Sequence, residues 1–132
     1  MMASMQTQRP TEVFIVDDST SIRLRLNELL RRMSDVAIVG EASSATAAVD
    51  GILRTHPDSV LLDLNLMGKS GMDVLRAVHG QAPDIVFVVL TNHSEPQYRR
   101  ACARAGARYF LDKSTEFERV RDVIAEIAAT RH

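Results

Sequence analysis

The sequence is poor in cysteine and aromatic residues, and neither sign of charge is in excess. Its single cysteine, Cys102, cannot form an intrachain disulfide and fits a reducing compartment. The 16 Lys and Arg residues against 17 Asp and Glu residues give no electrostatic reason to expect nucleic-acid binding. No apolar run approaches the ~18 residues that span a bilayer, and residues 1–11 lack the apolar stretch of a secretory signal. We therefore expect a cytoplasmic protein that binds neither membranes nor nucleic acid directly.

The length of the chain fits one folded domain. At 132 residues it can bury a single continuous core. Apolar runs and helical periodicity alternate without a break long enough to be a linker. We expect a flexible N-terminal tail over residues 1–11 and one domain over residues 12–130.

Four short apolar runs, at residues 13–16, 60–62, 85–90 and 109–111, each end on polar residues. Runs of this length, separated by helical segments, are typical of buried parallel strands. A fifth strand is expected at residues 36–41. The alternation predicts an α/β fold in which an open sheet of five parallel strands carries five helices on both faces, because right-handed crossovers place helices there.

Several details of the helices follow from side-chain type. Pro96 fits the first turn of the fourth helix, where a missing N–H costs nothing, and Tyr98 is expected on the buried face of that helix. Arg23 is expected on the solvent face of the first helix. Thr115 and Glu118 stand three residues apart and predict a capping box for the last helix.

The polar residues after the strands are Asp17, Asp18, Asp63, Thr91 and Lys113. Parallel strands present their carboxyl ends at one edge of a sheet, so these side chains are expected to lie together. Taken singly, each is more simply explained as a helix cap, a turn residue or a surface charge. Taken together, these explanations do not account for carboxylates at two strand ends and a hydroxyl and an amine at two others.

Such a set can hold a divalent metal and a phosphoryl group. A carboxylate is a weak nucleophile toward phosphorus until a metal and a cation neutralise the charge. Mg²⁺ prefers hard oxygen ligands and is usually held by one or two carboxylates plus the phosphate. Lys113 would supply a point charge to Asp63 before the reaction and to a phosphoryl oxygen afterwards, and Thr91 would donate a hydrogen bond to another phosphoryl oxygen.

These residues together resemble the receiver domain of two-component response regulators over nearly all of residues 12–129. The resemblance implies the flavodoxin-like strand order 2-1-3-4-5. It also implies that Asp63 is the phosphoacceptor. Mg²⁺ or Mn²⁺ would be bound by Asp18, Asp63 and the backbone carbonyl of Asn65, with Asp17 acting through water.

The resemblance further implies how a signal enters and leaves the domain. Thr91 matches the switch hydroxyl of the family, Lys113 its lysine, and Phe110 its aromatic switch position. The phosphoryl group would come from a histidine kinase or a histidine phosphotransfer protein and be lost by slow self-catalysed hydrolysis, so the chain is not expected to be an enzyme. A downstream protein would bind at helix 4, strand 5 and helix 5, where the candidate contact residues are Arg100, Arg104, Arg108 and Tyr109.

The sequence departs from the family pattern at three positions. Met67 and Ser114 stand where proline is common, and a non-proline cis bond costs ~2.5–4 kcal/mol, so the Lys113–Ser114 peptide is expected to be trans. Asn92 is bulkier than the residue usual beside the switch hydroxyl and is expected to obstruct access to the acceptor. His93 would either orient the attacking water or block it.

Two other functions remain open at this point. The chain could be the receiver of a longer DNA-binding regulator. In a different class, it could be a flavodoxin-like carrier of a small ligand, which would need a phosphate-cradling first loop. Asp17 and Asp18 in that loop would repel phosphate unless a metal is present.

Overall fold

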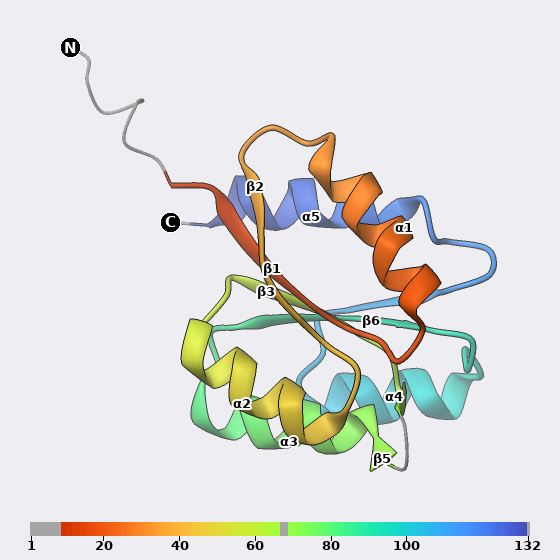
Figure 1. Ribbon diagram of the computed structural model, residues 1–132. Coiled ribbons are helices and arrows are strands. Elements are labelled where there is room, and N and C mark those ends of the chain that lie inside the picture. Colours follow the sequence, from red (N-terminus) through yellow and green to blue (C-terminus); the bar gives the residue numbers. More distant parts are fainter. Residues whose placement is uncertain (1–8, 67–68, 132) are drawn as a thin grey trace.

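The computed structural model describes residues 9–66 and 69–131, and within them a parallel sheet runs through the centre of the molecule (Figure 1). Its strands are β1 (Thr11–Val16), β2 (Val36–Ala42), β3 (Ser59–Leu62), β6 (Val86–Thr91) and β7 (Tyr109–Asp112). They pair in the order β2-β1-β3-β6-β7, all parallel. This confirms the predicted order 2-1-3-4-5, counted over the strands of this sheet. A short antiparallel pair, β4 (Asn65–Leu66) with β5 (Lys69–Ser70), was not predicted.

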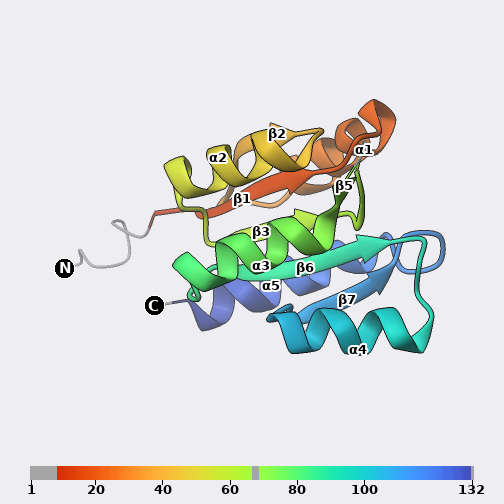
Figure 2. The same cartoon turned by 90° about the horizontal axis from the view of Figure 1, so that it is seen from below.

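Helices cover both faces of the sheet, as predicted (Figures 1 and 2). In the described part of the chain they are α1 (Thr20–Arg31), α2 (Ala45–Thr55), α3 (Gly71–Gln81), α4 (Pro96–Ala105) and α5 (Arg119–Thr130). α1 and α5 lie on one face, and α2, α3 and α4 lie on the other. Over residues 9–66 and 69–131, none of these helices has the length and apolar character needed to cross a bilayer.

The three central strands, β1, β3 and β6, are buried on both faces, which explains why they read as continuous apolar runs. In β3, Val60 and Leu62 pack toward α2 and α3, whereas Leu61 packs toward α1 and α5. The same alternation in β1 sends Phe14 to one core and Ile15 to the other. This double burial fixes the strands and therefore the positions of the polar residues that follow them.

Some local predictions were wrong. Thr11 belongs to β1 and is 1% exposed, so it is not part of a tail; residues 1–8 of the predicted tail, and Met67, lie outside the described residues. Tyr98 is exposed, because α4 buries only Cys102 along its fully described length. The capping box does not form: Glu118 occupies the N-cap of α5 without a side-chain cap bond, and the Thr115 N–H donates to the Asp112 carboxylate.

Candidate functional site

The carboxyl ends of four strands meet at a cavity of about 300 Å³. Backbone pairing brings them there: the Asp63 N–H donates to the Val16 carbonyl at 2.9 Å, and the Lys113 N–H donates to the Thr91 carbonyl at 2.8 Å. The five polar residues predicted at the strand ends, and Asn65, Asn92 and His93, are all among those that line the cavity, whereas Phe110 and the predicted contact residues are not. The lining residues are Asp17, Asp18, Ser19, Ile22, Asp63, Asn65, Thr91, Asn92, His93 and Lys113.

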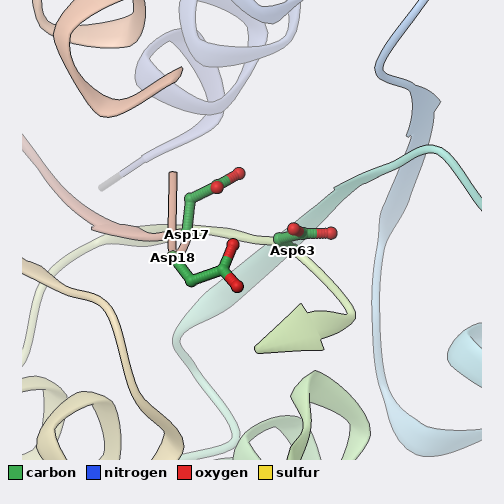
Figure 3. A group of neighbouring side chains, drawn as sticks. All are labelled: Asp17, Asp18 and Asp63. Carbon is green, nitrogen blue, oxygen red and sulfur yellow. The ribbon is translucent and has the colours of Figure 1, made fainter. Parts of the chain in front are cut away.

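Three carboxylates form the acidic side of this cavity (Figure 3). Asp17 and Asp63 are 2% and 5% exposed, and Asp18 is exposed. One ligand oxygen from each lies within 4.8 Å of the others, so the group could hold a metal ion. The simpler explanation of Asp17 and Asp18 as helix caps does not hold, because the N-cap of α1 is Ser19, whose Oγ accepts from the Ile22 N–H.

Lys113 bridges two of these carboxylates. Its Nζ donates to Asp17 Oδ2 at 2.8 Å and to Asp63 Oδ2 at 3.1 Å, and its side chain is 12% exposed. The sequence argument paired Lys113 with Asp63 alone, so the bond to Asp17 was missed. Three carboxylates and one ammonium group give a local charge of −3 + 1 = −2.

The protonation behaviour of the site follows from burial and this charge. Burial raises the pKa of the Asp63 carboxyl, and although the Lys113 ammonium lowers it, the net direction is upward, with the Asp17 charge adding to the rise. Burial lowers the pKa of Lys113, but the hydrogen bond that its ammonium donates to Asp17 and the charges of both carboxylates outweigh it and raise the pKa. Lys113 therefore remains a cation, whereas the Asp63 carboxylate carries an uncompensated cost of burial.

The loop after Asp63 is held against the start of α3. The Asn65 N–H donates to Asp63 Oδ1 at 3.2 Å, and the Gly71 N–H donates to the Leu64 carbonyl at 2.8 Å. A Cβ on Gly71 would collide with the backbone carbonyl oxygen of Asp63. Glycine is therefore required there for the helix to approach the loop that carries Asp63 and Asn65.

Thr91 lies opposite this loop, at the end of β6. Its side chain is fully buried, and Oγ1 accepts from the His93 N–H at 3.2 Å. The Asn92 side-chain oxygen accepts from the Ser114 hydroxyl at 3.0 Å, and the Lys113–Ser114 peptide is trans, as predicted. The ring of the partly buried His93 lies 5.5 Å from that of Tyr98.

Arg23 supports the acidic loop, a role that the sequence argument missed. Its side chain is 18% exposed rather than free in solvent. Nη1 donates to the Asp17 backbone carbonyl at 2.6 Å, and Nε donates to Glu41 Oε1 at 3.2 Å. The signal in the sequence was its place in the first turn of α1, five residues after Asp18, close enough for a long side chain to fold back.

The predicted aromatic switch residue, Phe110, lies on β7, where it pairs with Val89 of the strand that ends in Thr91. The partly buried Phe110 ring packs near Val89 and Cys102. The Arg99 guanidinium lies 4.7 Å over this ring, and its Nη1 donates to the Phe110 carbonyl at 3.3 Å. The predicted contact residues lie near Phe110 on α4 and β7, where Arg100, Arg104 and Arg108 are exposed and Tyr109 is partly buried.

The fold and this site are those of a phosphorylation-controlled signalling domain. Residues 13–125 match the family model of the response regulator receiver domain, and the chain belongs to this family. It is a receiver domain of the two-component systems.

Known proteins agree with this assignment. The chain is 30% identical over 121 residues to a nitrate/nitrite response regulator protein homolog of Haemophilus influenzae, covering 92% of this chain and 58% of that protein. It is 36% identical over 108 residues to the regulatory protein LuxO of Vibrio cholerae, covering 81% of this chain and 23% of that protein. The signal receiver domain of the response regulator NarL from Mycobacterium tuberculosis superposes with a TM-score of 0.82 at 30% identity, covering 92% and 98% of the two chains. The chain thus spans about half the length, or less, of the curated relatives it matches.

Proposed function

We propose that Asp63 accepts a phosphoryl group from a histidine kinase or a histidine phosphotransfer protein. The observation that carries this proposal is the bridge from Lys113 to a buried carboxylate that faces the cavity. An incoming phosphoryl group brings negative charge toward this carboxylate, and a fixed ammonium 3.1 Å away reduces the repulsion. After transfer, Lys113 pairs with a phosphoryl oxygen, and the Thr91 hydroxyl donates to another.

A divalent metal fits the charge and the ligands of the site. The local charge of −2 matches one Mg²⁺ or Mn²⁺, and carboxylate oxygens are the ligands that these ions prefer. We assign direct ligation to Asp18, to Asp63 and to the backbone carbonyl of Asn65. Asp17 acts through water, because its Oδ1 already accepts from the Ser19 N–H and its Oδ2 from Lys113. When bound, the metal would neutralise charge on the transferred group.

The domain acts as a switch and not as an enzyme with a separate substrate. It forms its own aspartyl phosphate and hydrolyses it, with Asn92 and His93 at the mouth of the cavity setting the rate. Phe110 and Thr91 then shift the face of α4, β7 and α5, where Arg100, Arg104, Arg108 and Tyr109 would contact a downstream protein. We also propose that this occurs in the cytoplasm, since the single cysteine is a buried thiol, which suits a reducing compartment.

The test is incubation with a small phosphodonor such as acetyl phosphate and Mg²⁺, read by intact mass. We expect one added phosphoryl group, which disappears with EDTA and in Asp63→Asn. Asp50→Asn is the matched control, because Asp50 is exposed on α2 and pairs only locally with Arg54. An adduct of unchanged yield in Asp63→Asn would contradict the assignment.

A second candidate function is favoured by the length of the relatives. Because the matched regulators are longer than this chain, the output could pass to a linked DNA-binding domain. The reading frame beyond residue 132 in the natural gene decides between these outputs. A flavodoxin-like carrier is disfavoured, because Asp17 and Asp18 occupy the loop where such a protein would cradle phosphate.

A further inference from the structure

The loops that follow β6 and β7 are joined by side chains beyond the end of the backbone ladder. The last backbone rung is the 2.8 Å bond from the Lys113 N–H to the Thr91 carbonyl. One residue further on, the Ser114 hydroxyl donates to the Asn92 side-chain oxygen at 3.0 Å. This bond links the residue after Thr91 to the residue after Lys113, and so connects two groups that face the same phosphoryl position.

The loop on the β7 side gives this bond a fixed base. The Ser114 N–H donates to Asp112 Oδ1 at 2.8 Å, and the Thr115 N–H donates to the same oxygen at 3.1 Å. Ser114 is therefore held in place, and its hydroxyl restrains Asn92 rather than following it.

Asn92 lies between two residues whose positions depend on each other. Thr91 Oγ1 is buried and accepts from the His93 N–H at 3.2 Å. Asn92 directly follows Thr91, so any displacement of Thr91 that also moves Asn92 must stretch or break the hydrogen bond that Ser114 donates to Asn92.

We propose that the Asn92–Ser114 hydrogen bond is a tie that holds Thr91 in its unphosphorylated position, so that Asn92 and Ser114 are positioning residues for the phosphoryl switch. The inference rests on the proposed role of Asp63. It differs from steric obstruction by Asn92, because obstruction assigns no role to the hydroxyl of Ser114. Breaking the tie from the Ser114 side leaves the bulk of Asn92 in place and separates the two explanations.

The first test is the affinity for fluoroberyllate, a phosphoryl mimic, in the presence of Mg²⁺. The loss of one exposed hydrogen bond can change the affinity only modestly, so Ser114→Ala is expected to bind fluoroberyllate about twofold to fivefold more tightly than the wild type. Ser114→Thr keeps the hydroxyl and should restore the wild-type affinity. In the double variant Asn92→Ala/Ser114→Ala, the gain in binding free energy for fluoroberyllate should be smaller than the sum of the gains in the two single variants, because both changes remove the same hydrogen bond. Unchanged affinity in Ser114→Ala overturns the proposal.

The second test does not depend on phosphorylation. Hydrogen exchange of the His93 amide in the unliganded protein should be faster in Ser114→Ala and unchanged in Ser114→Thr. Thr115→Ala is the matched control, since it removes a neighbouring exposed hydroxyl and keeps the bond from the Thr115 N–H to Asp112. If the wild type binds no fluoroberyllate, the proposed role of Asp63 is wrong. The exchange rates of the His93 amide then still test whether the Asn92–Ser114 hydrogen bond restrains this loop. Equal exchange in Ser114→Ala and wild type overturns it.

Discussion

Replacing Asp18 by asparagine tests whether the charge of the site is balanced by a metal. The ligand oxygens of Asp17, Asp18 and Asp63 lie within 4.8 Å of one another. At that separation two negative charges repel by roughly 0.9 kcal/mol in the dielectric of water and by roughly 3.5 kcal/mol at an effective dielectric constant of about 20. Because Asp18 is exposed, the lower figure applies. In EDTA, Asp18→Asn should therefore raise the free energy of unfolding by about 1 kcal/mol.

Mg²⁺ should reverse this order of stability. An ion that binds only the folded state, at 100 times its Kd, adds about 2.7 kcal/mol to the free energy of unfolding. For a domain of this size that corresponds to a rise in Tm of roughly 8–13 °C. The wild type should show this rise, whereas Asp18→Asn, which lacks one charged ligand, should gain much less.

Thermal unfolding followed by circular dichroism, in EDTA and over a series of Mg²⁺ concentrations, measures both effects. Asp50→Asn controls for the loss of an exposed carboxylate away from the cavity and should respond to Mg²⁺ as the wild type does. A wild-type Tm that does not move with Mg²⁺ would refute the charge argument. Equal gains in the wild type and Asp18→Asn would refute the ligand role of Asp18.

Three further changes have expected outcomes. Gly71→Ala forces a Cβ onto the loop of the acceptor, so it should lower the free energy of unfolding by about 1–3 kcal/mol in urea and slow phosphorylation by acetyl phosphate. Burial raises the pKa of Asp58, but its hydrogen bonds from Arg9 and from the Glu12 N–H lower the pKa overall, so its stabilisation is present above pH 3.8 and is lost as the pH falls through the folded pKa. In Asp58→Asn the free energy of unfolding should fall by about 1 kcal/mol at pH 7. Denaturant titrations at a series of pH values should also show that it depends less steeply on pH in the acid range than in the wild type. Arg99→Met removes a cation from the Phe110 ring and should tighten fluoroberyllate binding about twofold, with Arg100→Met as the control.

The sheet and the acidic edge could be predicted because their signals are local and strong. Strands buried on both faces must be apolar throughout, so the first polar residue after each run marks where the strand ends. Asp63 and Thr91 were placed at one edge by this rule alone, and the cavity contains both. The rule works because backbone pairing, and not side-chain preference, brings strand ends together.

The remaining contacts depend on the reach and surroundings of single side chains. Helical spacing placed Arg23 on the outer face of α1 but could not show that its guanidinium folds back to the Asp17 carbonyl. Tyr98 has the helical spacing of a buried residue, yet it lies in the first turn of α4, which is exposed to solvent. The capping box at Thr115 failed because the Thr115 N–H donates to Asp112 and α5 begins only after Glu118. Which acceptor a given N–H group finds depends on the three-dimensional positions of the acceptors, and sequence spacing alone does not give these.

The route from the cavity to the proposed output face follows from unequal packing among the helices. Thr91 pairs with Asp112, and Val89 pairs with Phe110, so β6 and β7 join the switch hydroxyl to the aromatic ring through a fixed ladder. α4 lies outside this ladder (Figure 2), buries only Cys102 along its fully described length, and has no side-chain cap bond at its start. α3, by comparison, buries Val74, Leu75 and Val78 and begins with a capped N-terminus. Because a helix with few buried side chains costs least to displace, movement of Thr91 should reach the proposed output face of α4, β7 and α5 first through a shift of α4.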